Sequence, residues 1–328
     1  MRRHLLTAAA LATAAFTLTA CGTTEPAADE QAMKPAEKIT LTDASGQKVV
    51  LNGPAKKVVG TEWHEVELLV SLGIDPVGVA DVKGYKTWDS AVPLKNEPKD
   101  IGTRGEPSMD TIAALKPDLI VAGTDLPPTA VKQLRDVAPV MEVKSANAAD
   151  PIGQMTENLD LLAQATGTTQ KAAELKKTFE AKVEEGRNAL AGAGLAGANF
   201  AFADGYVVSN QTSIRPFTSG SLIGAVNERL GLKNDWTIKG DAAYGLGTTD
   251  VEGLTKLSAD VHFAYIGNEG DEASTPFTGA LAKDKVWTSL PFVKEGNVHR
   301  LSDGIWMFGG PESMNEYIDS VVAALTKK

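Results

Sequence analysis

The stretch TRGEPSMDTIAALKPDLIVAG, residues 103–123, carries the local signals of a helix, a turn and a buried strand. Ser108 is a residue type that commonly precedes the first turn of a helix, and the apolar positions after it recur at helical spacing. Asp118 ends this segment, and the apolar run LIVAG follows it. The stretch therefore predicts half of a βα unit, in which a short helix leads into a strand of a parallel sheet.

The same pattern returns at residues 245–267, GLGTTDVEGLTKLSADVHFAYIG. A shift of 142 positions places Asp110 on Glu252 and Asp118 on Asp260, and it matches the apolar positions between them. A second pair of segments, at 68–79 and 226–236, places a Leu-Gly-aliphatic turn after a helical stretch in each copy. We therefore predict two related α/β lobes.

The N-terminus has the features of a lipoprotein leader. Residues 1–20, MRRHLLTAAALATAAFTLTA, carry two arginines and then an apolar stretch without an acidic residue, which predicts a secretory signal peptide. Cys21 follows in the context LTAC and precedes Gly22, as in a bacterial lipobox. We expect Cys21 to be acylated after cleavage; the alternative is an ordinary cleaved signal with an unrelated cysteine. Because it is the only cysteine, no disulfide can form.

Composition sets further limits on the protein. A length of 328 residues with 43% hydrophobic and 23% charged residues is sufficient for two ordinary globular domains. Residues 21–38 are rich in Ala, Pro, Glu and Thr and predict a flexible tether, so the folded part begins near Ile39. Loss of the leader would take the formal net charge from −10 to about −12, which argues against nucleic acid as a partner.

The rest of the chain alternates strands with helices. Residues 38–52 predict a β-hairpin, and short buried strands are expected at KVVG, PVGVA, DLIVAG and PVMEV. The helical stretch 151–191 repeats Leu175, Phe179 and Val183 along one face, and a last helix begins at Pro311. We expect a signal peptide at 1–20, a tether at 21–38, an N-terminal lobe at 39–150, a helical linker at 151–192 and a C-terminal lobe at 193–328. A long helix between the lobes should limit their closure.

Sequence motifs for catalysis are weak. The GxGxxG at 192–197 follows a helix and precedes a strand, which is the reverse of a dinucleotide-binding turn. His64-Glu65 starts like a zincin helix, but Leu68 stands where the second histidine belongs. No GxSxG elbow and no phosphate-binding loop is present. We expect no catalytic residue, no resident cofactor and no protein-bound bare metal, although His64 with carboxylates remains the alternative metal site.

Aromatic residues and arginines are the candidates for ligand binding. Trp63, Trp88, Tyr244 and Trp306 lie in or beside loops that are expected to follow strands, where α/β sheets present their ligands. After the leader the chain has six arginines against twenty-four lysines, and Arg104 and Arg215 fall in Gly/Pro/Ser-rich stretches predicted as loops. The alternative is surface arginine with partly buried tryptophan. Together these residues favour an aromatic cleft whose guanidinium groups donate to anionic oxygens.

Three segments carry a resemblance to a known family. KVVGTEWHEVELLVSLGIDPVGVADVKGYKTW, IGTRGEPSMDTIAALKPDLI and VWTSLPFVKEGNVHRLSDGIWMFGGPESM closely resemble the substrate-binding proteins of ABC importers for iron(III)-siderophores, above all the ferric hydroxamate binders. The resemblance implies two three-layer α/β lobes joined by one long interlobe helix, the class III type of periplasmic binding protein. It implies delivery of a ferric siderophore to an ABC permease dimer with a cytoplasmic ATPase, from the extracytoplasmic side of the cell membrane.

The resemblance also assigns roles to single residues. It implies that Arg104 hydrogen-bonds the hydroxamate oxygens, and that Asp110 and Glu252 meet arginines of the two permease subunits. The alternative is that both acids only stabilise helix N-termini. Trp63, Trp88, Tyr244 and Trp306 correspond to aromatic cleft residues, with Tyr244 replacing a tryptophan, and the family's cleft tyrosine after DLIVAG is replaced by Asp125 or Leu126.

The chemistry of such a ligand sets what the protein must supply. Six chelator oxygens saturate the iron, so we expect no protein ligand to the metal, with Arg104 and Arg215 as donors to the charged oxygens and tryptophan faces against apolar arms. The alternatives are the same fold binding a catecholate siderophore, haem or cobalamin, and a surface-anchored enzyme that acts on the chelate. Haem would engage an axial ligand such as His64.

Overall fold

The computed structural model describes residues 37–209 and 211–327. The predicted signal peptide, Cys21 and nearly all of the predicted tether lie outside these residues. The first elements among the described residues are β1 (Ile39–Thr42) and β2 (Lys48–Leu51), which form an antiparallel hairpin, as predicted. Within the described residues, no helix combines the length and apolar character needed to cross a membrane.

The first lobe is built on a five-stranded sheet in which every strand pairing is parallel. Its order is β5-β4-β3-β6-β7. The strands are β3 (Val58–Gly60), β4 (Gly78–Val79), β5 (Lys99–Asp100), β6 (Leu119–Gly123) and β7 (Val140–Val143). The helices are α1 (Trp63–Ser71), α2 (Val82–Trp88), α3 (Met109–Leu115) and α4 (Pro128–Arg135). The four predicted strands of this lobe are confirmed.

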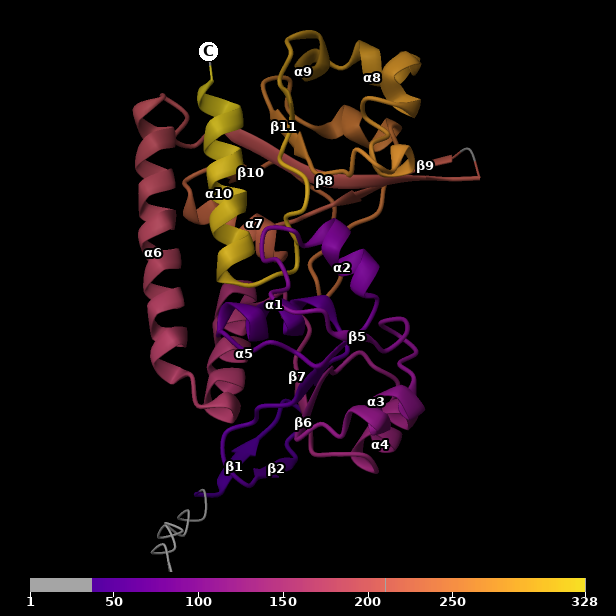
Figure 1. Cartoon of the computed structure of the whole chain (residues 1–328). Helices are drawn as coiled ribbons and strands as arrows, with labels where there is room; N and C mark the ends of the chain where they lie inside the picture. Colours follow the sequence, from indigo (N-terminus) through magenta and orange to yellow (C-terminus); the bar gives the residue numbers. More distant parts are fainter. Residues whose placement is uncertain (1–36, 210, 328) are drawn as a thin grey trace, which may run out of the picture. The chain divides into compact units, whose positions relative to one another are not determined.

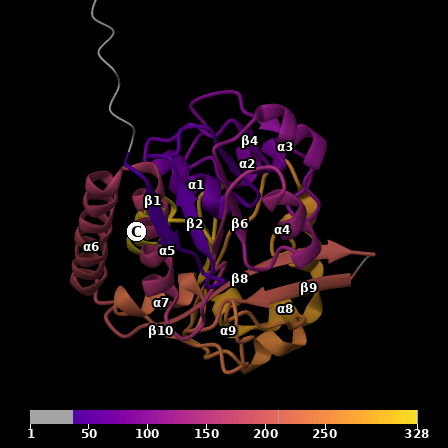
Figure 2. The same ribbon diagram turned by 90° about the horizontal axis from the view of Figure 1, so that it is seen from below.

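Helices cover both faces of this sheet. On one face, Leu68 and Leu69 of α1 pack with Leu119 and Val121 of β6. On the other face, Ile120 of β6 packs with buried side chains of α3 and α4. Figure 2 shows α1 and α5 on one side of the strands and α3 and α4 on the other. The first lobe therefore has the three predicted layers.

The predicted helical linker consists of two helices. α5 (Pro151–Thr166) ends at Gly167, whose φ of 73° is left-handed and favours glycine, and α6 (Thr169–Gly192) follows. The early residues of α6, including Leu175, pack in the first core, whereas Phe179 and Val183 pack in the second. α6 is therefore the long interlobe helix, and Figure 1 shows it running beside both lobes.

The second lobe has a mixed sheet of order β10-β8-β11-β12, with β9 paired to β8 in antiparallel fashion. The strands are β8 (Asn199–Val208), β9 (Gln211–Pro216), β10 (Lys233–Asn234), β11 (His262–Tyr265) and β12 (Val298–Arg300). The helices are α7 (Leu222–Arg229), α8 (Lys285–Ser289), α9 (Pro291–Lys294) and α10 (Pro311–Thr326), with 3₁₀ segments η1 (Glu252–Lys256), η2 (Glu272–Ser274) and η3 (Ala280–Lys283). α10 begins at Pro311, as predicted.

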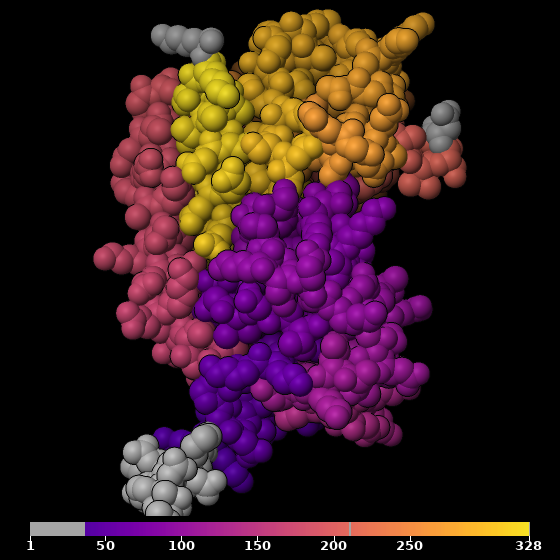
Figure 3. Space-filling view, in the orientation of Figure 1, coloured from indigo at the N-terminus to yellow at the C-terminus, as the bar shows by residue number. Residues whose placement is uncertain are grey.

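Helices also cover both faces of the second sheet. Phe200 and Phe202 of β8 pack with α6, α7 and α10 on one face. Ala201 of β8 and Phe263 of β11 pack on the other face with η1 and the segment that includes Trp287. Figure 3 shows the surface of α10 beside that of α6. The α/β fold of two three-layer lobes is thus confirmed.

Two sequence-based expectations are wrong in detail. Arg215 belongs to strand β9 and not to a loop, because residues 211–216 pair along β8. The second copy of the opening pattern forms the 3₁₀ segment η1, whereas the first forms the α-helix α3. In both copies the segment leads into a buried parallel strand, β6 or β11, so the repeat itself is present.

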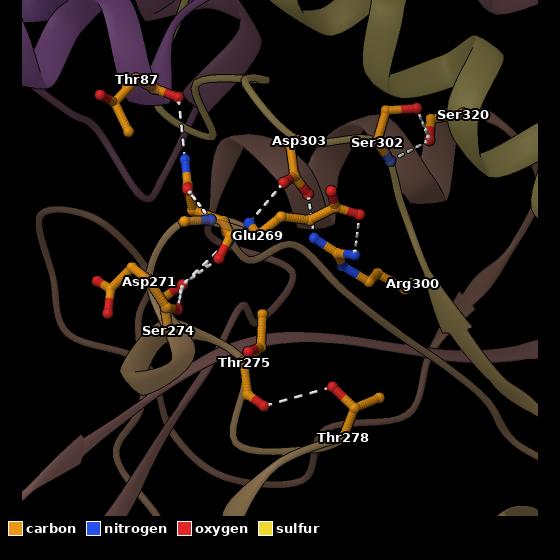
Figure 4. Close-up of polar contacts among 12 residues, drawn as sticks. Thr87, Glu269, Asp271, Ser274, Thr275, Thr278, Arg300, Ser302, Asp303 and Ser320 are labelled. Atoms are coloured by element: carbon orange, nitrogen blue, oxygen red, sulfur yellow. Dashed lines mark hydrogen bonds and ion pairs between the residues drawn. The ribbon is translucent and has the colours of Figure 1, made fainter.

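Contacts between the lobes lie away from α6 as well. Glu67 of α1 accepts hydrogen bonds from the backbone N–H groups of Gly310 (2.8 Å) and Ser313 (3.1 Å) at the start of α10. At another point, the Asn268 side chain donates to the carbonyl of Thr87 at 3.3 Å. Figure 4 shows the loop around Glu269, next to Asn268, tied to Arg300 and Asp303 of the second lobe. The lobes are therefore joined at several places around the pocket described below.

Candidate ligand-binding site

A pocket of about 490 Å³ lies between the lobes. Its walls come from segments that follow the carboxyl ends of strands in both sheets, such as Glu62 after β3, Asp125 after β6 and Ser145 after β7. This is the edge where open α/β sheets bind ligands. The volume is in the range of small-molecule binding sites. The repeated lobes thus meet at equivalent edges and form one site.

Arg104 extends from the loop between β5 and α3 into this pocket. Its Nη1 donates to Oε1 of Glu62 at 2.8 Å, and its Cζ lies 4.0 Å from the ring centroid of Trp63 and 5.4 Å from that of Trp306. These contacts are a charge-assisted hydrogen bond and cation–π stacking. Of the N–H groups of Arg104, the hydrogen bond to Glu62 uses one on Nη1, so the others can donate to a ligand.

Arg215 supplies the second guanidinium, from strand β9. Its Nε and Nη2 donate to the two carboxylate oxygens of buried Asp204 on β8, with Nε to Oδ1 at 3.0 Å. Burial lowers the pKa of Arg215, but the charge of Asp204 more than offsets this, and the pKa is raised. Its Cζ lies 5.4 Å from the ring of Phe308. The β8–β9 pairing thus presents a pre-oriented cation to the pocket.

Tyr244 closes one side of the pocket through a contact between the lobes. Its hydroxyl donates to Oδ2 of Asp125 at 3.1 Å, and the hydroxyl of Ser145 donates to Oδ1 of Asp125 at 2.9 Å. Burial, followed by the charge of Asp125, raises the pKa of Tyr244, so its phenol stays neutral. The loop that carries Tyr244 is held by Asp241, whose carboxylate accepts from backbone N–H groups including that of Tyr244.

Aromatic rings form the apolar wall. Trp306 and Phe308 line the pocket, with ring centroids 5.2 Å apart, and Tyr244 meets Phe308 edge to face at 5.6 Å. Trp63 lies behind this wall: it is buried, its ring contacts Trp306 at 4.8 Å, and its indole N–H donates to a backbone carbonyl. Trp88 is half-buried at the end of α2 and packs in the same cluster.

Two buried groups lie at the base of the site. His64 is buried, and its Nε2 has no hydrogen-bond partner among the described residues. Burial lowers the pKa of His64 against the opposing charges of Glu62 and Asp125, so the ring is neutral. Burial also raises the pKa of Glu65, which accepts backbone hydrogen bonds from Thr61 and Glu62. In the part of the chain that the structure describes, no three such side chains are placed to hold a metal ion.

The fold brings only some of the predicted ligand-binding residues to the pocket. Arg104, Arg215, Tyr244 and Trp306 line the pocket, whereas Trp63 and Trp88 do not. Asp110 and Glu252 lie elsewhere, exposed on α3 and η1, without an ion pair among the described residues. Sequence reasoning missed other lining residues: Glu62, Asp125 as an acidic wall, Tyr206 and Phe308. For Glu62 a signal existed, because Glu62 and Glu65 have the spacing of a capping box, which the structure contains.

Comparison with known proteins assigns the family. Residues 58–303 match the family described as periplasmic binding protein. The chain belongs to this family. Similar curated proteins are named as substrate-binding proteins of ABC transporters, and the predicted resemblance to the siderophore-binding type is confirmed.

Individual relatives cover most of the chain. The Fe(3+)-citrate-binding protein YfmC of Bacillus subtilis is 30% identical over 270 residues, 79% of this chain and 77% of its own. The iron(3+)-hydroxamate-binding protein FhuD of Escherichia coli is 27% identical over 274 residues, 80% and 84%. Among solved structures, the Fe3+-Desferal-bound siderophore-binding protein FhuD of Vibrio cholerae superposes with a TM-score of 0.72 at 24% identity, covering 83% of this chain and 98% of that one. The fold is therefore that of the siderophore-binding members of the family.

Proposed function

We propose that this protein is an extracytoplasmic lipoprotein that binds an iron(III)-siderophore of the hydroxamate type and delivers it to an ABC permease. The observation that carries the proposal is the pairing of two arginines, Arg104 and Arg215, with an aromatic wall in one interlobe pocket. The guanidinium groups can donate paired hydrogen bonds to the oxygens of the siderophore, and the aromatic rings can pack against its apolar arms. The protein carries out no catalysis in this proposal.

The donor set favours iron that is already chelated. Among the described residues no group of three side chains suits a metal ion, and the potential ligand His64 keeps its Nε2 atom buried. A ferric siderophore brings its own six oxygens, so the protein has to recognise the outer surface of a complex. Charge-assisted hydrogen bonds to those oxygens contribute about 1.5–3 kcal/mol each. Hydrogen bonds from the two arginines and burial of the apolar arms would each strengthen the binding of such a complex.

The curated relatives are named for several chelate classes, among them hydroxamate, citrate and achromobactin. The hydroxamate-binding FhuD of Escherichia coli and the citrate-binding YfmC are both similar to this chain. A ferric trihydroxamate core is neutral, whereas ferric citrate and ferric catecholate complexes are anionic. Because each pocket arginine already contacts a carboxylate, Glu62 or Asp204, the site has no spare positive charge for an anionic core. This charge balance supports a neutral ferric hydroxamate as the ligand, in preference to an anionic citrate or catecholate complex.

Transport requires surfaces beyond the pocket. Asp110 and Glu252 are exposed at the starts of equivalent segments of the repeat, one on each lobe. We assign them to docking on the two permease subunits, one carboxylate to each. Cys21, in its lipobox context, is the proposed site of acylation, and it would hold the protein at the outer face of the membrane.

Tryptophan fluorescence tests the binding function. Trp306 lines the pocket and Trp63 lies behind it, so a bound ferric complex should quench the emission. The titration uses ferric hydroxamates, ferric catecholates, ferric citrate, haem and cobalamin as separate ligands. We expect saturable quenching by the hydroxamates at the lowest concentrations. Saturation by a catecholate or by haem alone would overturn the hydroxamate assignment.

A further inference from the structure

The charges around the pocket do not balance. Arg104 contacts Glu62 at 2.8 Å, and Arg215 makes a two-point contact with Asp204. Each guanidinium thus has its own carboxylate. No lysine is present among the described residues that line the pocket, and the neutral His64 ring adds no positive charge. One further lining residue, Asp125, carries a negative charge.

Asp125 has no basic partner among the described residues. Its two carboxylate oxygens accept hydrogen bonds from the hydroxyls of Tyr244 and Ser145, at 3.1 Å and 2.9 Å. Both donors are neutral, so they orient the carboxylate and leave its charge in place. Asp125 is exposed on the pocket wall at the end of β6. It therefore presents an oriented negative charge to any ligand in the pocket.

The backbone beneath Asp125 is shaped for this arrangement. A Cβ atom at Gly123 would collide with Oδ1 of Asp125 and would lie 2.7 Å from the Ser145 hydroxyl oxygen. Only glycine at this position leaves the room for both side chains to lie over β6. The Asp125 carboxylate, its two hydroxyl donors and the glycine backbone beside them therefore form one preorganised part of the pocket wall.

We propose that Asp125 makes this pocket select ferric complexes that carry a positively charged arm, and that a protonated amine of the ligand docks on its carboxylate. This inference rests on the proposed function. The neutral trihydroxamate core contacts Arg104 and Arg215. The ammonium group of the arm has three N–H donors, and it donates to the lone pairs of the Asp125 carboxylate that the two hydroxyls leave free. A complex with a negative arm meets like charge at the same place.

Three matched ligands test the inference. Ferric desferrioxamine B has a free terminal ammonium group, its N-acetyl derivative is neutral, and its N-succinyl derivative is anionic, while the iron-binding hydroxamates are the same in all three. Affinities are measured by fluorescence quenching and by calorimetry. For the unaltered protein we expect about tenfold weaker binding for each step of charge, which corresponds to about 1.4 kcal/mol per step.

Two variants locate the effect. Asp125→Asn keeps an acceptor for Tyr244 and removes the charge, so the three ligands should bind within about threefold of one another. Asp136→Asn makes the same change in net charge at the exposed end of α4 and outside the pocket, and it should keep the full charge preference. Variation with salt is a further readout, because the preference should weaken as ionic strength rises.

The outcomes separate this inference from the proposed function. Equal affinity for the three ligands, tightest binding of the succinyl derivative, or an unchanged preference in Asp125→Asn would overturn charge selection and leave siderophore binding intact. Absence of binding by all three ligands, including to the unaltered protein, would overturn both the inference and the hydroxamate function.

Discussion

Glu67 in the first lobe and Ser313 at the start of α10 in the second are joined by two hydrogen bonds: the Ser313 N–H donates to Oε1 at 3.1 Å, and its hydroxyl donates to Oε2 at 2.9 Å. Both side chains are buried. A carboxyl group at a helix N-terminus accepts hydrogen bonds from backbone N–H groups that have no partner within the helix. This contact holds the lobes together beside the pocket, in addition to α6.

The same contact predicts how stability depends on pH. Burial raises the pKa of Glu67 from 4.5 to about 7, against the hydrogen bonds from Gly310 and Ser313. Since the folded pKa is above the unfolded one, the folded state holds the extra proton between pH 4.5 and about 7, and stability falls as pH rises through this window. The loss is about 3 kcal/mol. Burial raises the pKa of the neighbouring Asp89 too, which adds to the same trend.

Thermal unfolding of Glu67→Gln checks this prediction. The amide mimics the protonated acid, so the variant should match the unaltered protein near pH 4.5 and gain relative stability as pH rises to 7.5. Glu316→Gln, on the exposed face of α10, serves as control and should not change the profile. Parallel profiles for Glu67→Gln and the unaltered protein across the window would contradict the assignment.

Arg104 should contribute directly to ligand affinity. Arg104→Ala removes a charge-assisted donor, and the dissociation constant for ferric desferrioxamine B should rise about tenfold to a hundredfold. Arg104→Lys keeps the charge without the planar fork and should be intermediate. Calorimetry measures the affinities, and Arg187→Ala on α6, outside the pocket, should bind as the unaltered protein does. Unchanged affinity in Arg104→Ala would remove Arg104 from the site.

Asp110 and Glu252 should matter for transport and not for binding. The double variant Asp110→Ala with Glu252→Ala should lose uptake of radioactive ferric siderophore into cells, because each permease subunit would lack its carboxylate partner. Its affinity for the ligand in solution should equal that of the unaltered protein. A double variant with Asp136→Ala and Glu316→Ala, both exposed, is the matched control. Normal uptake by the Asp110/Glu252 variant would refute the docking role.

Acylation of Cys21 should attach the protein to the membrane. In the unaltered protein, processing should leave an acylated Cys21 as the first residue, and the protein should fractionate with membranes. Cys21→Ala removes the acylation site and should release the protein into the soluble extracytoplasmic fraction or leave the leader uncleaved. Fractionation with mass spectrometry of the N-terminus distinguishes these forms. Membrane attachment of a cleaved Cys21→Ala protein would contradict a lipid anchor.

The fold could be predicted from the sequence because its signals are local. The apolar run at 119–123 and the face of α6 with Leu175, Phe179 and Val183 are buried as periodicity predicts. Strand β9 escaped prediction because residues 211–216 are held as a strand by pairing with β8, not by their own composition. The same limit applies to η1, since packing decides whether a short amphipathic segment becomes an α-helix or a 3₁₀ turn.

The site could be predicted only in part, for a related reason. Arg104 and Trp306 fall in recognisable loop motifs, but the carboxylate partners of the arginines are set by packing: Glu62 is 42 positions from Arg104, and Asp204 lies on the strand paired with that of Arg215. Asp204 is on a buried strand, and Asp125 gains its role from Tyr244, which is 119 positions away in the sequence. The Asp125–Tyr244 pairing arises only when the two lobes are placed face to face, whereas the two arginine–carboxylate pairings arise within single lobes from tertiary packing and strand pairing.

A crystal structure with ferric desferrioxamine B bound would show directly whether the pocket recognises an iron complex through its outer surface. We expect the iron to be coordinated by chelate oxygens alone, with Arg104 and Arg215 within hydrogen-bond distance of those oxygens and the chelate against Trp306. A protein side chain bonded to the iron, or a chelate seated away from both arginines, would contradict it.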